Sequence, residues 1–221
     1  GYNSKTESGV IYITGTYGFF IQFLYDFFEF PFDIYYQNGK AQSGKDVSAF
    51  AFGLNPRVKL GPVKLGMGAD YLSGDDAGSS NYLSEERTFN KFYGSGFRYH
   101  GWMNHYVYIK GSTKNGGLVD LYPTLAWKIS PHHILDMKTH FFSLANSVMI
   151  DDHIIDDKDL GTEFDTRYTY KHNKEFSVNV GFSYYFTTET FESVKLGLDA
   201  DIKQPYWIWT MLTYTPDIFS N

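Results

Sequence analysis

Apolar and polar residues alternate with a period of two along most of this chain, and the segment Phe176–Phe186 shows the pattern most clearly. Phe, Val and Tyr occupy its even-numbered positions, whereas Ser, Asn, Gly and Tyr occupy the odd-numbered ones. Successive side chains of a β-strand point to opposite faces, so the alternation predicts strands with one apolar face and one polar face. We find no amphipathic helix of useful length to cover the apolar face. The pattern therefore predicts a sheet closed on itself, with its apolar face in lipid and its polar face lining a lumen.

The alternation recurs along the chain and predicts nine strands. They cover residues 10–22, 28–38, 46–59, 63–73, 117–129, 133–146, 160–171, 175–187 and 205–216. Short turns at 61–62, 130–133 and 170–174 alternate with long polar connections at 74–116, 147–159 and 188–204. Short turns on one side and long loops on the other are typical of outer-membrane β-barrels, whose short turns face the periplasm. We therefore expect an all-β, antiparallel transmembrane β-barrel domain over residues 1–221, with the three long connections on the outside.

An odd number of strands does not fit a complete barrel of this class, which has an even count and a periplasmic N-terminus. Two interpretations follow. Either Tyr106–Lys110, inside the first long connection, is a tenth strand, or the chain is the C-terminal part of a larger barrel. A single strand inserted at Tyr106–Lys110 would put the short turns on opposite sides, so we favour the larger barrel.

The amino-acid composition further limits the classes of protein to which this chain can belong. At 221 residues the chain is long enough for one domain, and its 19% aromatic content suits β-structure with aromatic girdles at the membrane interfaces. A net charge of -6 argues against nucleic-acid binding, and the absence of Cys excludes disulfide and thiolate chemistry. The sequence has no apolar run of about 18 residues, so we expect no spanning helix. The four Trp residues are expected at or near the interface levels: Trp102, Trp127, Trp207 and Trp209.

The alternation also predicts which charged side chains face the lumen. The basic set is Arg57, Lys59, Lys64, Lys128, Lys138 and Arg167, and the acidic set is Asp33, Asp70, Asp120, Asp136, Glu163 and Asp165. Basic residues gather next to the turns at 61–62 and 130–133, which is the expected periplasmic mouth. There they would raise the local concentration of an anionic polymer. The alternative is that the opposite charges pair across strands and stabilise the barrel wall.

Other candidate chemistry is sparse. Three inward Tyr residues offer flat aromatic faces for stacking on sugar rings: Tyr35, Tyr122 and Tyr185. The acidic loop 151–159 is a weak candidate for a divalent cation, with carboxylates at Asp151, Asp152, Asp156, Asp157 and Asp159. It lacks EF-hand spacing, and the simpler interpretation is a solvated surface loop. We see no nucleophile elbow and no cluster of His and Cys, so we predict no enzyme, no catalytic residue, no cofactor and no firm metal site.

An ordered set of short segments carries a resemblance to a known family. These segments are Ala69–Asp76, Phe92–Gly94, His100–Trp102, Asn115–Asp120, Ala126–Pro131, Leu160–Asp165 and Tyr184–Phe186. In order and spacing, from about Asp46 to Phe186, they resemble the alginate-export family of outer-membrane β-barrels. The resemblance implies a barrel of about eighteen strands in a chain about twice this length. It also implies export of an anionic polysaccharide through a basic constriction, although many relatives have unknown substrates.

These observations lead to one expected function and two alternatives. We expect an outer-membrane channel of a Gram-negative bacterium that passes a hydrophilic solute, with an anionic polysaccharide as the first candidate, by diffusion or export. Its partners would be outer-membrane lipid, the solute, and periplasmic or surface proteins, but not nucleic acid. The first alternative is a barrel with a plugged lumen that has a structural, partner-binding or enzymatic role. The second is a soluble, lipocalin-like binding barrel.

Overall fold

The computed structural model describes residues 2–5, 9, 11–82, 84–91, 100–198 and 203–216. The strands are β1 (Tyr2–Lys5), β2 (Ile11–Leu24), β3 (Phe28–Lys40), β4 (Asp46–Leu54), β5 (Arg57–Leu60), β6 (Val63–Leu72), β7 (Glu85–Glu86), β8 (Leu118–Lys128), β9 (His133–Ser143), β10 (Val148–Ile150), β11 (His153–Ile155), β12 (Asp159–Lys171), β13 (Phe176–Phe186) and β14 (Tyr206–Tyr214). The helices are α1 (Ile109–Ser112) and α2 (Glu189–Leu196). Neither helix has the length and apolar character needed to span a membrane.

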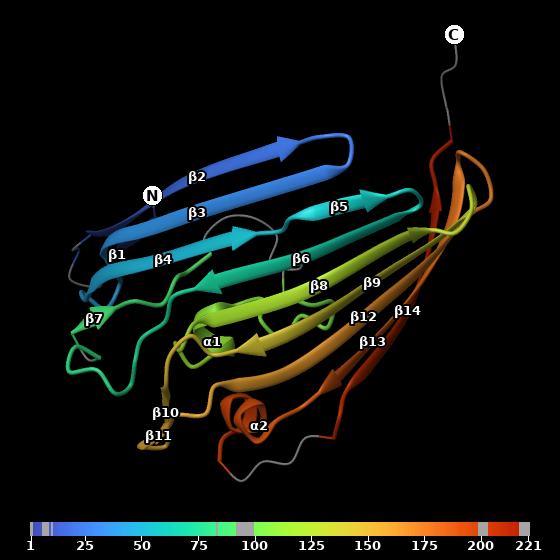
Figure 1. Ribbon diagram of the computed structural model, residues 1–221. Coiled ribbons are helices and arrows are strands. Elements are labelled where there is room, and N and C mark those ends of the chain that lie inside the picture. Colours follow the sequence, from blue (N-terminus) through green and yellow to red (C-terminus); the bar gives the residue numbers. More distant parts are fainter. Residues whose placement is uncertain are drawn as a thin grey trace.

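Most strands belong to one antiparallel sheet, shown in Figure 1. Its order is β1-β2-β3-β4-β6-β8-β9-β12-β13-β14, with β5 joined to β3 and β6, and β7 paired in parallel with β4. The hairpin β10–β11 forms a separate two-stranded sheet. Within the described residues β1 and β14 lie at the two margins and do not pair with each other. The fold is all-β with antiparallel pairing of the long strands, as expected. Within the described residues the main sheet is open and curved.

Each of the nine expected strands coincides with a long strand of this sheet, with one division. The expected strand 46–59 is split into β4 and β5 at Asn55-Pro56. Proline has no N–H to give to a ladder, and here the Pro56 carbonyl accepts a hydrogen bond of 3.1 Å from the Met67 N–H. Val10, the first residue of the first expected strand, lies outside the described residues.

The long connections contain regular structure that the alternation did not predict. The tenth strand suggested at Tyr106–Lys110 is wrong, because the helix α1 begins at Ile109. The connection 188–204 contains α2, whose N-cap Thr188 accepts a hydrogen bond from the Phe191 N–H at 3.2 Å. The hairpin β10–β11 likewise lies in the connection 147–159. These connections are therefore packed elements and not extended polar loops.

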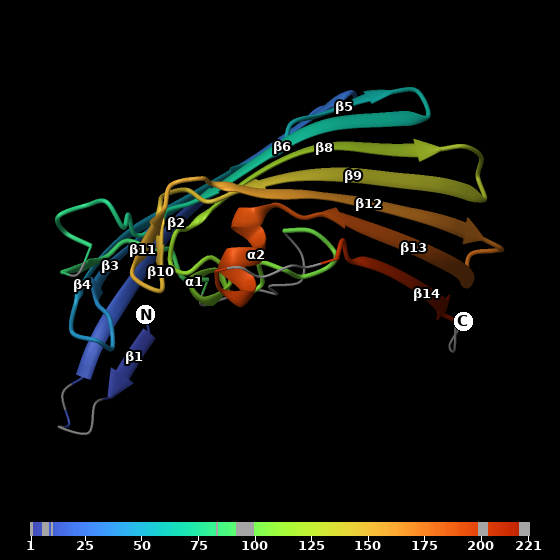
Figure 2. The same cartoon turned by 90° about the horizontal axis from the view of Figure 1, so that it is seen from below.

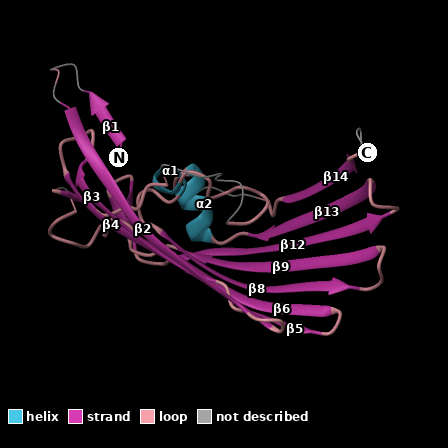
Figure 3. Cartoon of the chain, turned by 90° about the horizontal axis from the view of Figure 1, so that it is seen from above, coloured by secondary structure: helices cyan, strands magenta, loops and turns pink. Residues whose placement is uncertain are grey.

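The sheet has two unlike ends. Short turns at 25–27, 61–62, 129–132 and 172–175 lie together at one end, which we call the short-turn end. The longer connections 73–117, 144–158 and 187–205 lie at the other, the long-loop end. Figures 2 and 3 show that the sheet curves into a trough and that α1 and α2 lie on its concave side. The short connection 41–45 between β3 and β4 also lies at the long-loop end, so the sorting of connections by length agrees with the sequence pattern in part.

The convex face is apolar and open. One row of Cα partners across four strands consists of Phe19, Ile34, Phe52 and Tyr71. Large apolar side chains on this face are widely exposed, for example Phe19 at 58% and Ile208 at 61%. Neither helix lies on this side of the sheet (Figure 2). In water such a continuous apolar face would be unfavourable.

The buried apolar core lies on the concave side, at the long-loop end. Phe142 and Tyr185 project from the sheet, and Tyr106 and Phe191 come from the connections that cover it. Their rings pack closely, with 4.6 Å between the centroids of Tyr106 and Phe142 and 4.7 Å between those of Tyr185 and Phe191. This core attaches α1 and α2 to the inside of the trough.

Gly68 gives a test of how tightly the concave face is packed. A Cβ at this position would overlap the ring of Tyr122, which lies across the glycine from the neighbouring strand. We expect Gly68→Ala to destabilise the fold by about 1–3 kcal/mol through overpacking. Urea unfolding in detergent micelles measures the effect. Gly15→Ala is the matched control, because its nearest atoms are a flexible Tyr17 ring tip at 3.3 Å. Equal unfolding midpoints for the two variants would contradict this packing.

Candidate functional site

The strand register places all twelve charged residues predicted for the lumen on the concave face. Asp33, Asp70 and Asp120 lie in one row, with Gly53 as the Cα partner of both Asp33 and Asp70. The rows toward the short-turn end contain the basic residues and Asp136. The face of each residue follows from its parity in the strand. The surroundings of each side chain do not follow from parity, and they differ sharply between the two ends of the sheet.

At the short-turn end, charges pair across strands. Glu29 accepts from Lys64 Nζ at 2.6 Å and lies 3.6 Å from Arg57 Nη1. Arg167 Nη2 is 2.8 Å from Asp136 Oδ2. Glu29 was missing from the predicted acidic set, although its parity matches that of Asp33 on the same strand.

Two residues of the predicted basic set remain without an ion-pair partner at this end, within the described part of the chain. They are Lys59 and Lys128, both exposed on the concave face beside the short turns. The paired residues fit the wall-stabilising alternative, whereas Lys59 and Lys128 do not.

In the middle of the concave face lies a buried polar cluster, which we call the central cluster. It consists of Asp120, His140, Glu163 and Asp165, all with 0% exposure. The Nδ1 of His140 is 2.8 Å from both carboxylate oxygens of Asp120. The Ser183 hydroxyl donates to Asp165 Oδ1 at 2.5 Å. Buried carboxylates need such partners, because removing a charge from water is costly.

The segment 100–117, which we call the inner loop, supplies further donors to this cluster. The Trp102 N–H donates to Asp165 Oδ2 at 3.2 Å, and the Met103 N–H donates to Glu163 Oε1 at 2.8 Å. Gly101 lies directly over Glu163, with a positive φ of 78°. Asp120, Glu163 and Asp165 therefore face inward as expected, but they are covered by the chain itself and are not open to solvent.

The three candidate sugar-stacking residues have different surroundings. Tyr185 is fully buried, and its hydroxyl is 2.7 Å from that of Tyr106, so the inner loop covers its ring. Tyr122 is 6% exposed, with Lys138 Nζ 4.0 Å from its ring centroid. Tyr35 lines a cavity. Only Tyr35 thus borders open space wide enough for a ligand.

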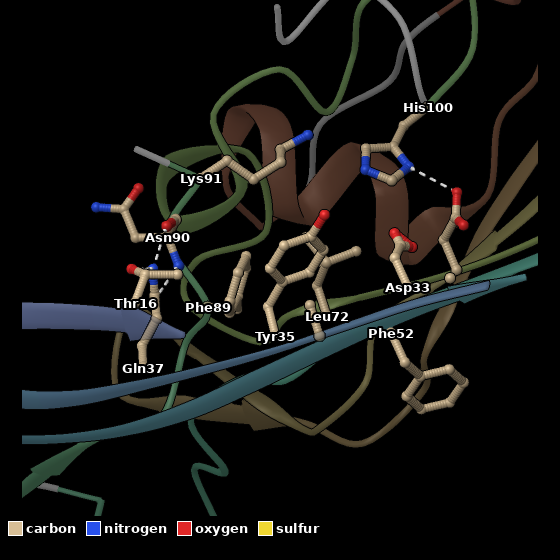
Figure 4. A pocket seen from close by; sticks show the side chains of 13 residues that line it. Thr16, Asp33, Tyr35, Gln37, Phe52, Leu72, Phe89, Asn90, Lys91 and His100 are labelled. Carbon is tan, nitrogen blue, oxygen red and sulfur yellow. Dashed lines mark hydrogen bonds and ion pairs between the residues drawn. The ribbon is translucent and has the colours of Figure 1, made fainter. Parts of the chain in front are cut away.

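That cavity, the Tyr35 cavity, has a volume of about 430 Å³ and lies between the sheet and the segment 89–91. Figure 4 shows Asp33, Tyr35, Lys91 and His100 around it, whereas Phe52 points to the opposite face. Gln37 fixes the segment by bonding both the carbonyl and the N–H of Asn90, at 2.6 and 3.0 Å. Burial lowers the pKa of Lys91 to about 8, against the opposing pull of nearby Asp70. The cavity thus combines carboxylates with a buried ammonium group.

Helix α2 ties down the far part of the inner loop. Lys195 Nζ donates to the carbonyls of His105 and Ser112, at 2.6 and 3.1 Å. Burial lowers the pKa of Lys195 to about 8. Burial also lowers the pKa of His105 to about 4, and the charge of Lys195 lowers it further. The sequence pattern missed this anchor. The cap Thr188, three residues before Phe191, was an available indication of the helix.

Two predicted features are corrected by this geometry. The carboxylates of the loop 151–159 do not gather: Asp157 accepts from the Thr190 hydroxyl at 2.9 Å and Asp159 from the Gly161 N–H at 2.9 Å. Three Trp residues lie on the concave side and not in an outer girdle. The Trp102 ring contacts the Trp209 ring at 6.0 Å between centroids, and Trp207 lies beside Trp209 at 6.1 Å.

No protein-family model and no curated protein matches this sequence. The resemblance to the alginate-export family therefore stays a prediction. Of the segments that carry it, Phe92–Gly94 lies outside the described residues.

The low pKa of His105 predicts how the inner loop responds to acid. The imidazole packs against the rings of Tyr106, Tyr185 and Phe191 and faces the Lys195 ammonium. In the unfolded loop His105 binds a proton below its ordinary pKa of about 6.5, but in the folded loop only below about 4. Stability from this residue is complete above pH 6.5 and is lost as the pH falls toward 4, by up to about 1.4 kcal/mol per pH unit.

Hydrogen exchange of the inner-loop amides, compared with that of His105→Phe at each pH, measures this effect. We expect protection in the wild type to fall between pH 6.5 and 4 more steeply than in His105→Phe, which packs a ring but cannot titrate. The same pH slope in both proteins would show that His105 does not control the loop.

Proposed function

We propose that this chain forms the wall of an outer-membrane pore that passes a hydrophilic solute along its concave face. The observation that carries the proposal is the contrast between the two faces of one sheet. The convex face exposes Phe, Ile, Leu and Tyr side chains, while the concave face holds the charged residues. Lipid is the solvent that an uncovered apolar sheet face suits, and water or a polar solute suits the other face.

The unlike ends of the sheet support an orientation. Short turns face the periplasm in barrels of this kind, so the short-turn end would be the periplasmic mouth. The unpaired Lys59 and Lys128 lie there, and their field would attract an anion. The resemblance to the alginate-export family agrees with an anionic polysaccharide as solute and with a Gram-negative outer membrane, and it is the reason for proposing a larger barrel around this sheet.

The inner loop limits the passage at the long-loop end. It covers the central cluster and packs between α2 and the sheet, so a solute would have to pass beside it or displace it. This observation favours the second candidate, a barrel with a plugged lumen that has a structural or partner-binding role. The two candidates differ in one measurable property, which is the ion conductance of the intact protein in a planar lipid bilayer.

Gly101→Ala provides a sharp version of this test. Its Cβ would overlap the Glu163 carboxylate, and alanine disfavours the positive φ at this position, so the inner loop should leave the sheet. We expect a measurable conductance in the wild type and a larger one in Gly101→Ala. Gly78→Ala is the control, because its nearest neighbour is Asp76 Oδ1 at 3.5 Å. A wild type and a Gly101→Ala variant that are both closed would favour the structural candidate.

The charge at the short-turn end gives a separate prediction. We expect Lys59→Glu combined with Lys128→Glu to shift the reversal potential in a salt gradient toward cations, because both lysines lack an ion-pair partner among the described residues. The control pair is Lys45→Glu with Lys203→Glu, the same change of charge at a half-buried and an exposed position near the long-loop end. Equal shifts in the two double variants would contradict a selective role for the short-turn end.

A further inference from the structure

Three metal-ligating side chains from distant parts of the sequence meet beside the Tyr35 cavity. Asp70 comes from β6, Asp120 from β8 and His100 from the start of the inner loop. One donor atom from each lies within 4.8 Å of the other two, and no other group of three among the described residues does so. Figure 4 shows the His100 imidazole at one side of the cavity, above the sheet.

The spacing of the donor atoms suits a transition-metal ion. His100 Nδ1 is 3.3 Å from Asp120 Oδ2 and 3.9 Å from Asp70 Oδ2. Ligand atoms about 2.0–2.2 Å from a tetrahedral ion are about 3.3–3.5 Å apart. The first separation already matches, and the second needs a movement of a few tenths of an ångström, within reach of the half-buried Asp70 side chain. Imidazole nitrogen and carboxylate oxygen are both ligand atoms for Zn²⁺, and water would take the remaining position.

The surroundings of these residues carry an excess of negative groups. Asp33, Asp70, Asp120, Glu163 and Asp165 lie on neighbouring strands of the same face. The lysines that interact with these carboxylates through their charge are Lys91 and Lys138. Five carboxyl groups against two ammonium groups supply ligands for a divalent cation, which must displace the protons of those it binds.

Two buried polar atoms near the group also lack a hydrogen-bond partner in the described structure. They are His140 Nε2 and Glu163 Oε2, and both residues have 0% exposure. His140 and Glu163 are Cα partners on adjacent strands, and His140 Nε2 is separated from Asp165 Oδ2 by 3.9 Å. These atoms lie on the side of His140 that faces Asp165, away from Asp120, and they are not part of the proposed ligand set.

The contact between His140 and Asp120 fits an outer-shell role. His140 Nδ1 lies 2.8 Å from both oxygens of Asp120, which fixes the carboxylate plane. Metal-binding carboxylates are usually held in this way by a second residue. We propose that Asp70, His100 and Asp120 bind a divalent transition-metal ion of the Zn²⁺ type, which joins the inner loop to the sheet.

The test uses the full chain folded in detergent, stripped with a chelator and titrated with Co²⁺ as a spectroscopic substitute for Zn²⁺. We expect one ion per chain with visible d–d absorption that Zn²⁺ abolishes by displacement. His100→Gln and Asp70→Asn should each weaken binding by more than about ten-fold. His133→Gln is the matched control, because His133 lies at the short-turn end with its Nδ1 against the Tyr168 hydroxyl. Its affinity should equal that of the wild type.

The assignment fails if the wild type gives no Co²⁺ spectrum, or if His133→Gln weakens binding as much as His100→Gln does. Asp70→Asn keeps the side-chain size and leaves the inner-loop sequence unchanged. Equal affinity in Asp70→Asn and wild type would therefore overturn the site even where His100→Gln alters the loop. A second supporting readout is trypsin cleavage at Lys110 and Lys114, which should slow when Zn²⁺ is added to the wild type and not to Asp70→Asn.

Discussion

The central cluster is buried on the concave face of the sheet, and this burial determines how the inner loop and the helices are arranged there. Asp120, Glu163 and Asp165 cannot be solvated by water in this position, and the backbone donors of their own strands are used in the ladder. Donors must therefore come from other groups. The N–H groups that follow Gly101 provide them, and only a residue without a Cβ can approach Glu163 so closely. The path of the inner loop is thus set by the carboxylates beneath it.

The same constraint explains why the helices lie inside the trough. Once the chain passes over Glu163, Tyr106 enters the space above Phe142 and Tyr185, and Phe191 of α2 closes the apolar core from the other side. The hydrogen bonds near Gly101 and the apolar packing of Tyr106 cooperate. Each reduces the conformational entropy that the loop loses when the other contact forms. The convex face takes no part in this core. Its large apolar side chains remain exposed.

The period-two pattern was sufficient to predict the nine long strands and their faces, because these depend only on parity and on local turn residues. It missed the short strands β1, β7, β10 and β11. It was insufficient for the interior. Whether Asp120 is exposed or buried depends on the inner loop, which packs over the sheet. The alternation of residues along a strand contains no information about where that loop packs. The same applies to Trp209, which lies over Gly181 on the concave face and was expected at an interface. Helix α2 is short, and its local indications were the cap Thr188, the acidic first turn with Glu189 and Glu192, and Gly197 at its end.

The proposed passage and the inner loop share one trough, so the proposal requires the loop to be held firmly enough to remain inside and loosely enough to move. Lys195 holds the far part of the inner loop by donating to the carbonyls of His105 and Ser112. Its ammonium group must be buried to make these contacts. At the near part, the proposed ion would bind His100 of the loop together with Asp70 and Asp120 of the sheet. Loss of the ion would leave these carboxylates close together with only the charges of Lys91 and Lys138 to offset them, and the remaining repulsion would favour water between loop and sheet. Metal occupancy and the width of the passage would then be linked through the same loop, because both depend on whether His100 stays against the sheet.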